Sequence, residues 1–151
     1  FQFLAISEYD CGANILDRME TVARIRKILN DSNQNIVLHL LGCGNPKSIA
    51  LYSLCGADTF DSLHWIKFAM NPNTSKLDDF SYAELFDCTC KFCNSDYSYV
   101  ERVLLHNLGF IQNYMKQIRI AINDDELHML VDRFFGKQVT KQLQQILDSF
   151  K

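Results

Sequence analysis

Three cysteines and one histidine are spaced closely enough to bind a single metal ion. Cys88, Cys90 and Cys93 form a C-x-C-x2-C run, and His106 follows at a distance typical of zinc-binding fingers. Three thiolates and one imidazole match the closed tetrahedral set that zinc prefers in structural sites. Neighbouring cysteines this close cannot easily bridge one another, whereas a metal can gather all three. The run therefore predicts a structural zinc site on these four residues.

Two alternatives to this ligand set remain open at the level of sequence. The cysteines can be free or disulfide-linked, as in small stapled domains, although that arrangement needs an oxidising compartment and a cysteine-dense chain. His106 lies in the apolar stretch Leu104–Leu108 and can equally be an ordinary helix histidine. His128 is then the reserve candidate for the fourth ligand.

Length and composition indicate one globular unit with a substantial core. The chain has 151 residues, of which 48% are hydrophobic, and its net charge of −3 argues against a wholly basic nucleic-acid coat. The sequence contains no run of about 18 apolar residues that could cross a bilayer and no secretory leader. We therefore expect no membrane partner and a cytoplasmic location.

The first 62 residues read as three strands joined by helices. Apolar runs predict buried strands at 1–6, 36–41 and 57–62, and the intervening segments 14–29 and 46–55 have helical features. Pro46 suits a helix start, and Gly56 suits a helix end. Repeating βα units of this kind are typical of doubly wound sheets and of TIM barrels, and three strands alone cannot close a barrel.

Polar and glycine residues follow each of these strands. Glu8 follows the first, the Gly42–Pro46 turn follows the second, and Asp61 ends the third. In barrels the chemistry lies at the carboxyl ends of the strands, so we expect these three positions to share one face.

The remainder of the chain divides into two further parts. We expect a zinc-binding subdomain and a long helix over 71–122, after partial barrel units over 1–70. Apolar residues at helical spacing run from 108 to 122, and shorter helices are expected over 127–135 and 139–150, within a C-terminal part spanning 123–151.

Four motifs in order carry a family resemblance. They are Leu4-Ala-Ile-Ser-Glu8, Leu40-Leu-Gly-Cys-Gly-Asn-Pro46, Gly56-Ala-Asp-Thr-Phe-Asp-Ser62, and the cysteine run leading to His106-Asn107-Leu108. With these motifs the chain resembles the C-terminal part of the tRNA-guanine transglycosylase superfamily. The resemblance implies an α/β fold made of the last βα units of a TIM (β/α)8 barrel. It also implies an inserted subdomain that binds structural Zn2+, followed by C-terminal helices.

The resemblance also assigns roles to single residues. Asp61 corresponds to the catalytic aspartate, which attacks the nucleotide sugar and forms a covalent glycosyl intermediate, and this favours Asp61 over Asp58 as the nucleophile. Glu8 corresponds to a position lining the base pocket, and Gly42 and Gly44 to a loop that nucleic acid approaches closely. The general acid or base is expected on earlier strands, supplied by the remaining barrel half or by a partner subunit.

Several departures from the family pattern together point to its DNA-modifying branch. Only twelve residues separate Cys93 from His106, fewer than the family usually shows. Leu63-His-Trp-Ile-Lys67 replaces the basic, proline-containing segment expected after the catalytic aspartate, and Gln2-Phe3 replaces an expected glycine pair. The first expectation is therefore a transglycosylase that replaces guanine in DNA by a 7-deazaguanine base such as preQ0. The alternatives are the same exchange on tRNA, and a non-catalytic, zinc-stabilised module that binds nucleic acid or a partner.

Overall fold

The computed structural model describes residues 2–32 and 34–149 and contains a parallel three-stranded sheet. Its strands are β1 (Gln2–Ser7), β2 (Ile36–Leu41) and β3 (Thr59–Phe60), in the spatial order β1-β2-β3. In β1 and β2 the register pairs Gln2 with Ile36 and Ser7 with Leu41. Because the strands are parallel and in sequence order, their carboxyl ends meet at one edge of the sheet.

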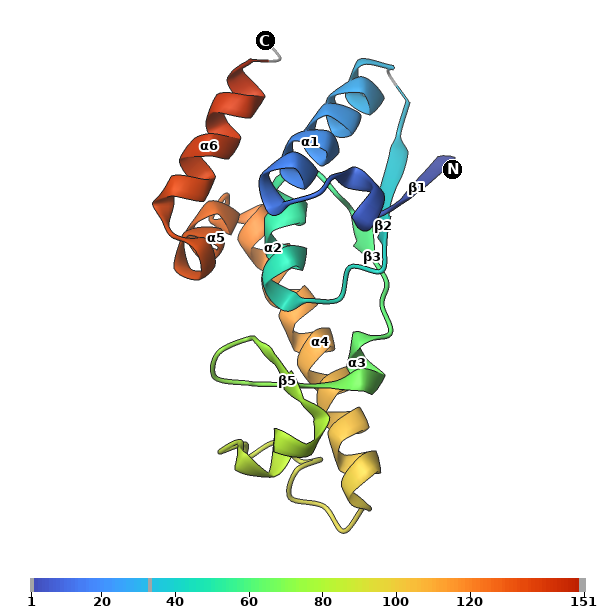
Figure 1. Cartoon of the computed structure of the whole chain (residues 1–151), viewed down its shortest axis with the longest axis vertical. Helices are drawn as coiled ribbons and strands as arrows, with labels where there is room; N and C mark the ends of the chain where they lie inside the picture. The colour runs from blue at the N-terminus through green and yellow to red at the C-terminus, as the bar shows by residue number, and fades with distance from the viewer. Residues whose placement is uncertain (1, 33, 150–151) are drawn as a thin grey trace.

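Two helices cover one face of this sheet. A short 3-10 helix, η1 (Tyr9–Cys11), leads into α1 (Ile15–Asp31), and α2 (Pro46–Leu54) returns the chain from β2 to β3. The side chain of Asn14 caps α1 by accepting two backbone N–H groups, and Asn45 caps α2 with proline in its first turn. Figure 1 shows both helices on the same side of the strands.

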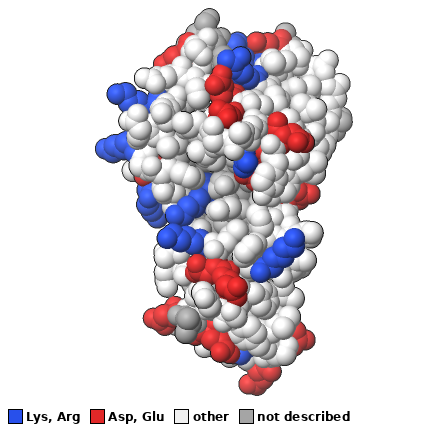
Figure 2. All heavy atoms as spheres, viewed as in Figure 1, with Lys and Arg blue, Asp and Glu red and all other residues white. Residues whose placement is uncertain are grey.

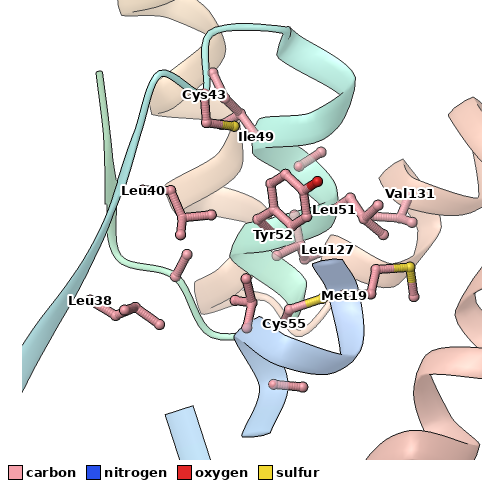
Figure 3. Packing of buried hydrophobic residues seen from close by; sticks show 14 of the residues in the cluster. Met19, Leu38, Leu40, Cys43, Ile49, Leu51, Tyr52, Cys55, Leu127 and Val131 are labelled. Carbon is pink, nitrogen blue, oxygen red and sulfur yellow. The ribbon is translucent and has the colours of Figure 1, made fainter. Parts of the chain in front are cut away.

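The core lies between the sheet and these helices. Leu38 and Leu40 of β2 are fully buried and extend toward Leu51 and Tyr52 of α2 (Figure 3). Alternate residues of a strand point to opposite faces, so His39 and Leu41 belong to the other face. There Phe3 keeps 57% of its surface exposed, and Leu41 is exposed as well. One face of the sheet is therefore covered, and the other is largely open.

The segment after β3 contains a small second sheet, in which β4 (Phe68–Met70) and β5 (Leu77–Asp79) are antiparallel. The short helix α3 (His64–Lys67) precedes this sheet, and the 3-10 helix η2 (Phe80–Leu85) follows it. An irregular stretch that carries the three cysteines of the predicted zinc site then leads into α4.

A 25-residue helix links the two ends of the molecule. This helix, α4 (Tyr99–Asn123), begins with a capping box in which Ser98 and Glu101 satisfy each other's backbone N–H groups. Figure 1 shows α4 running from the lower lobe, which holds β5, up behind α2. Two shorter helices, α5 (Leu127–Phe135) and α6 (Lys137–Asp148), follow and pack beside the core.

The mixed α/β class and the order of the main elements are as predicted. The strand at 36–41 and the helix at 127–135 have the predicted bounds, while β3 is shorter than expected and α6 begins two residues earlier. The predicted end of that last helix, Phe150, and the predicted first strand residue, Phe1, lie outside the described residues. Within the described part of the chain, no helix is both long enough and apolar enough to cross a membrane.

Candidate functional site

Asp61 lies at the carboxyl edge of the sheet and is held by the turn after β2. Its Oδ1 accepts the backbone N–H of Gly42 at 2.7 Å, while its side chain remains 56% exposed. Gly42 has φ of +78°, a conformation that favours glycine, and this directs its amide toward the carboxylate. One oxygen of Asp61 is therefore anchored, and the side chain stays accessible to a substrate.

Gly44 is required for a different reason from Gly42. A Cβ at Gly44 would lie 2.3 Å from both Cβ and Oγ of Ser62 and 2.9 Å from Nδ1 of His64. A Cβ at Gly42 would meet no atom within 4 Å, so its outer side is open. The first half of the glycine turn therefore faces open space, and the second half packs against the residue that follows Asp61.

Glu8 lies at the same edge, but its carboxylate turns into the protein. It is 8% exposed and accepts hydrogen bonds from the Tyr52 hydroxyl at 3.2 Å and from Arg18 Nη1 at 3.3 Å. Burial, followed by the Glu8 charge, raises the pKa of Tyr52, so the hydroxyl remains a donor. Glu8 thus joins the end of β1 to both covering helices.

Asp58 occupies the opposite end of β3 from Asp61. Its Oδ2 accepts the backbone N–H of Leu38 at 2.8 Å and pairs with Arg26 Nη2 at 2.5 Å. Arg26 also donates to the carbonyl oxygens of Gly56 and Ile36. These contacts tie the amino ends of two strands to α1, which is a structural arrangement remote from the Asp61 edge.

The cavity beside Asp61 is small. It measures about 120 Å³ and is lined by Gly44, Ser62 and Trp65, together with apolar residues from α4. Ligand pockets usually measure about 300–1,000 Å³. The described residues around Asp61 therefore do not enclose a cavity of that size.

The four predicted metal ligands converge in the lower lobe. The Nδ1 atom of His106 lies 3.5 Å from the Sγ atoms of Cys88 and Cys90 and 3.4 Å from that of Cys93. All four ligand atoms lie within 4.8 Å of one another. Zn–S and Zn–N bonds of ordinary length at tetrahedral angles would separate sulfur from nitrogen by about 3.5 Å. The four residues can therefore hold a metal ion.

Neighbouring groups orient the histidine. His106 is buried, and its Nε2 lies 2.8 Å from the carbonyl oxygen of Met70, so it donates there and leaves Nδ1 for the metal. Asn107, the next residue, is fully buried; its Oδ1 accepts the N–H of Met70, and its Nδ2 donates to the carbonyl oxygens of Trp65 and Phe68. This role of Asn107 was not predicted from the sequence, where the only signal was an asparagine beside a predicted ligand.

The thiol pKa values of Cys90 and Cys93 are shifted in opposite directions. Burial acts to raise the pKa of Cys90, but hydrogen bonding with the His106 ring and with Cys93 outweighs it and lowers the pKa to about 6. Burial, reinforced by hydrogen bonding with Cys90 and Cys88, raises the pKa of Cys93 to about 12. A divalent cation that binds here must displace the remaining thiol protons.

Two of the alternatives to this ligand set, disulfide bonding and the use of His128, find no support in the described structure. None of the six cysteines forms a disulfide, and His128 is exposed on α5, outside the cluster. On the face drawn in Figure 2, basic side chains gather around the middle of the molecule, whereas acidic ones predominate over the lower end. The basic part of this face is therefore separate from the tip of the lower lobe, which carries the cysteines.

Comparisons with known proteins agree with the family resemblance that the four sequence motifs indicate. A family model described as queuine tRNA-ribosyltransferase matches residues 1–140. A tRNA-guanine(15) transglycosylase from Pyrococcus abyssi is 34% identical over 112 residues, which is 63% of this chain and 18% of that relative. The protein of the same name from Methanococcus vannielii is 33% identical over 114 residues, or 65% of this chain and 18% of the relative. The chain thus matches less than a fifth of the length of these relatives.

Proposed function

Because the chain belongs to the queuine tRNA-ribosyltransferase family, we propose that it supplies the nucleophile and the zinc-binding part of a guanine transglycosylase. The observation that carries the proposal is Asp61 at the carboxyl edge of a parallel sheet, with Oδ1 held by Gly42 and the side chain still accessible. Chemistry in barrels is located at that edge.

The proposed reaction is an exchange of bases in two displacements. Asp61 Oδ2 forms a bond to C1′ of the target nucleotide as the C1′–N bond to guanine breaks, and guanine takes the electron pair and a proton. The ring nitrogen of the incoming base then loses a proton and attacks C1′, and the carboxylate leaves. One proton is gained and one is lost, so the exchange balances, and two inversions retain the configuration at C1′. The target base must leave its stack to reach Asp61.

Zinc is the metal we propose for the cysteine–histidine cluster. Cys88, Cys90, Cys93 and His106 fill all four tetrahedral positions, so none is left for water or substrate, and the ion would support structure. Through His106 and its contact with Met70, the ion would stabilise the segment that follows Asp61.

We propose tRNA as the nucleic-acid substrate and a 7-deazaguanine such as preQ0 as the incoming base. The support for tRNA comes from the relatives named above, whose names specify a tRNA guanine, while the incoming base is the one that the family resemblance implies. These comparisons favour the tRNA alternative over the DNA-modifying branch that the departures from the family pattern suggested.

Further barrel strands are needed to complete the site. We propose that residues 1–70 are the last βα units of a TIM barrel, that 71–122 form the zinc subdomain and long helix, and that 123–151 are C-terminal helices. The open face of the sheet, the small cavity and the short coverage of the relatives support this division. The remaining barrel half or a partner subunit would supply the acid or base and the rest of the base pocket.

The test is incorporation of labelled preQ0 by the complete protein, offered either tRNA or duplex DNA. We expect label in tRNA from the wild type and none from Asp61→Asn. Label in DNA alone would restore the DNA interpretation. Tight nucleic-acid binding with no incorporation into either polymer would favour a non-catalytic, zinc-stabilised module.

A further inference from the structure

A histidine on the open face of the sheet lies beside the proposed nucleophile. His39 is in the middle of β2, and the register pairs it with Thr59 of β3. Its neighbours in the strand, Leu38 and Leu40, are buried in the core, so the imidazole belongs to the opposite face. Asp61, two residues after Thr59, therefore lies on the same face as His39.

The imidazole is held in place by two neighbours. Its Nδ1 lies 2.8 Å from Oγ1 of Thr59, and its ring centroid lies 5.4 Å from that of Phe3. The side chain is 13% exposed, although the face around it is largely open. With these contacts in place, Nε2 lies 3.7 Å from Oδ2 of Asp61.

The Asp61 carboxylate decides which tautomer of the imidazole is favoured, and the threonine hydroxyl accommodates it because a hydroxyl can either donate or accept. A hydroxyl can donate to Nδ1 of a neutral imidazole, which leaves the ring proton on Nε2. Nε2–H then points toward a carboxylate oxygen, where a donor is favourable and a lone pair is not. The opposite tautomer would place two lone-pair-bearing atoms, Nε2 and Oδ2, against each other. The surroundings of the ring thus select the Nε2–H form.

The two oxygens of Asp61 differ as a result. Oδ1 is committed to the Gly42 amide at 2.7 Å, whereas the 3.7 Å separation of Oδ2 from Nε2 is longer than a hydrogen bond. Oδ2 therefore faces the imidazole but does not accept a hydrogen bond from it. A nucleophilic oxygen benefits from this arrangement. A strong hydrogen bond to Oδ2 would lower its reactivity, whereas a freely rotating carboxylate would lose its alignment with the substrate.

We propose that His39 is a positioning residue for the nucleophile: held by Thr59, it presents Nε2–H to Asp61 and keeps Oδ2 aligned for attack on C1′. The inference rests on the proposed function and adds to it a residue pair that the sequence motifs did not single out. Its effect should appear in kcat, since His39 orients the reacting group, and much less in KM.

The kinetic test compares two substitutions at His39 in the complete protein. His39→Phe keeps a ring and removes the donor, and it should lower kcat by about 10- to 100-fold with KM changed less than about threefold. His39→Gln places an amide N–H near the position of Nε2 and should recover much of that loss. Thr59→Val should lower kcat by a smaller factor, and adding it to His39→Phe should have little further effect. His128→Gln, on the exposed surface of α5, is the matched control and should behave as the wild type.

The outcomes separate this inference from the function on which it rests. If Asp61→Asn is inactive but His39→Phe keeps wild-type kcat, or if Gln rescues no better than Phe, the role of His39 is refuted and the function stands. If Asp61→Asn retains exchange, both fail. Spectra of 15N-histidine-labelled protein, with the signal assigned by its loss in His39→Phe, test the geometry without activity. An Nε2–H tautomer that Thr59→Val weakens supports the proposal, and an Nδ1–H tautomer in the wild type overturns it.

Discussion

Removing the Asn107 side chain should loosen the segment that joins the Asp61 edge to the cysteine–histidine cluster. Asn107→Ala deletes three hydrogen bonds, one from the N–H of Met70 at 2.9 Å and two to the carbonyl oxygens of Trp65 and Phe68, each at 2.7 Å. Three such bonds contribute about 3 kcal/mol in total, and stranding their buried partners raises the cost to about 3–5 kcal/mol. The side chain is fully buried, so water cannot readily replace it.

Hydrogen exchange at Met70 measures this effect locally. A loss of about 3 kcal/mol in the opening free energy corresponds to roughly 100-fold faster exchange of its amide, read by mass spectrometry of the complete zinc-loaded protein. We also expect faster loss of zinc to a chelator, because Met70 supplies the carbonyl that orients His106.

A matched control lies on the same helix. Asn113 of α4 is exposed, and Asn113→Ala should change stability by no more than about 0.5 kcal/mol, through helix propensity. Exchange at Met70 within a fewfold of the wild-type rate in Asn107→Ala would refute the view that this residue anchors the segment.

The other substitutions separate structural from chemical roles. Asp58→Asn loses a partly exposed ion pair with Arg26 but keeps an acceptor for the strand, so we expect a loss of about 1 kcal/mol in a thermal unfolding assay and continued base exchange. Gly44→Ala must displace Ser62, beside the proposed nucleophile Asp61, and should lower kcat while costing about 1–3 kcal/mol of stability; wild-type kinetics would show that the turn adapts. Cys90→Ser combined with Cys93→Ser should abolish stoichiometric zinc in metal analysis. Because the thiols must be deprotonated to bind, wild-type zinc affinity in a chelator competition should fall as the pH is lowered.

Strong local patterns in the sequence predicted the main elements. The apolar run at 36–41 became β2, and proline at the first turn marked the start of α2. The convergence of Cys88, Cys90, Cys93 and His106 was predictable because three of the four ligands are close neighbours in sequence, so short-range geometry limits where they can go.

Other features depend on contacts between distant segments. His39 read only as part of an apolar strand, and its relation to Asp61 arises from the register of β2 and β3. The amide contacts of Asn107 join residues about 40 positions apart. The start of α4, in contrast, could have been predicted from the sequence, because Ser98 and Glu101 have the spacing of a capping box. The helix was instead recognised only from the apolar residues that follow His106. The preference for DNA came from missing motifs, which are weak grounds in a chain that matches so little of its relatives.

Mapping a covalent intermediate tests the central claim most directly. The complete protein would be incubated with tRNA in the absence of an incoming base, denatured, and digested with nuclease and protease for mass spectrometry. We predict a nucleotide remnant attached through C1′ to Asp61, no such adduct in Asp61→Asn, and its discharge when preQ0 is added before denaturation. An adduct on Asp58 or on another residue, or exchange by Asp61→Asn at the wild-type rate, would contradict the account.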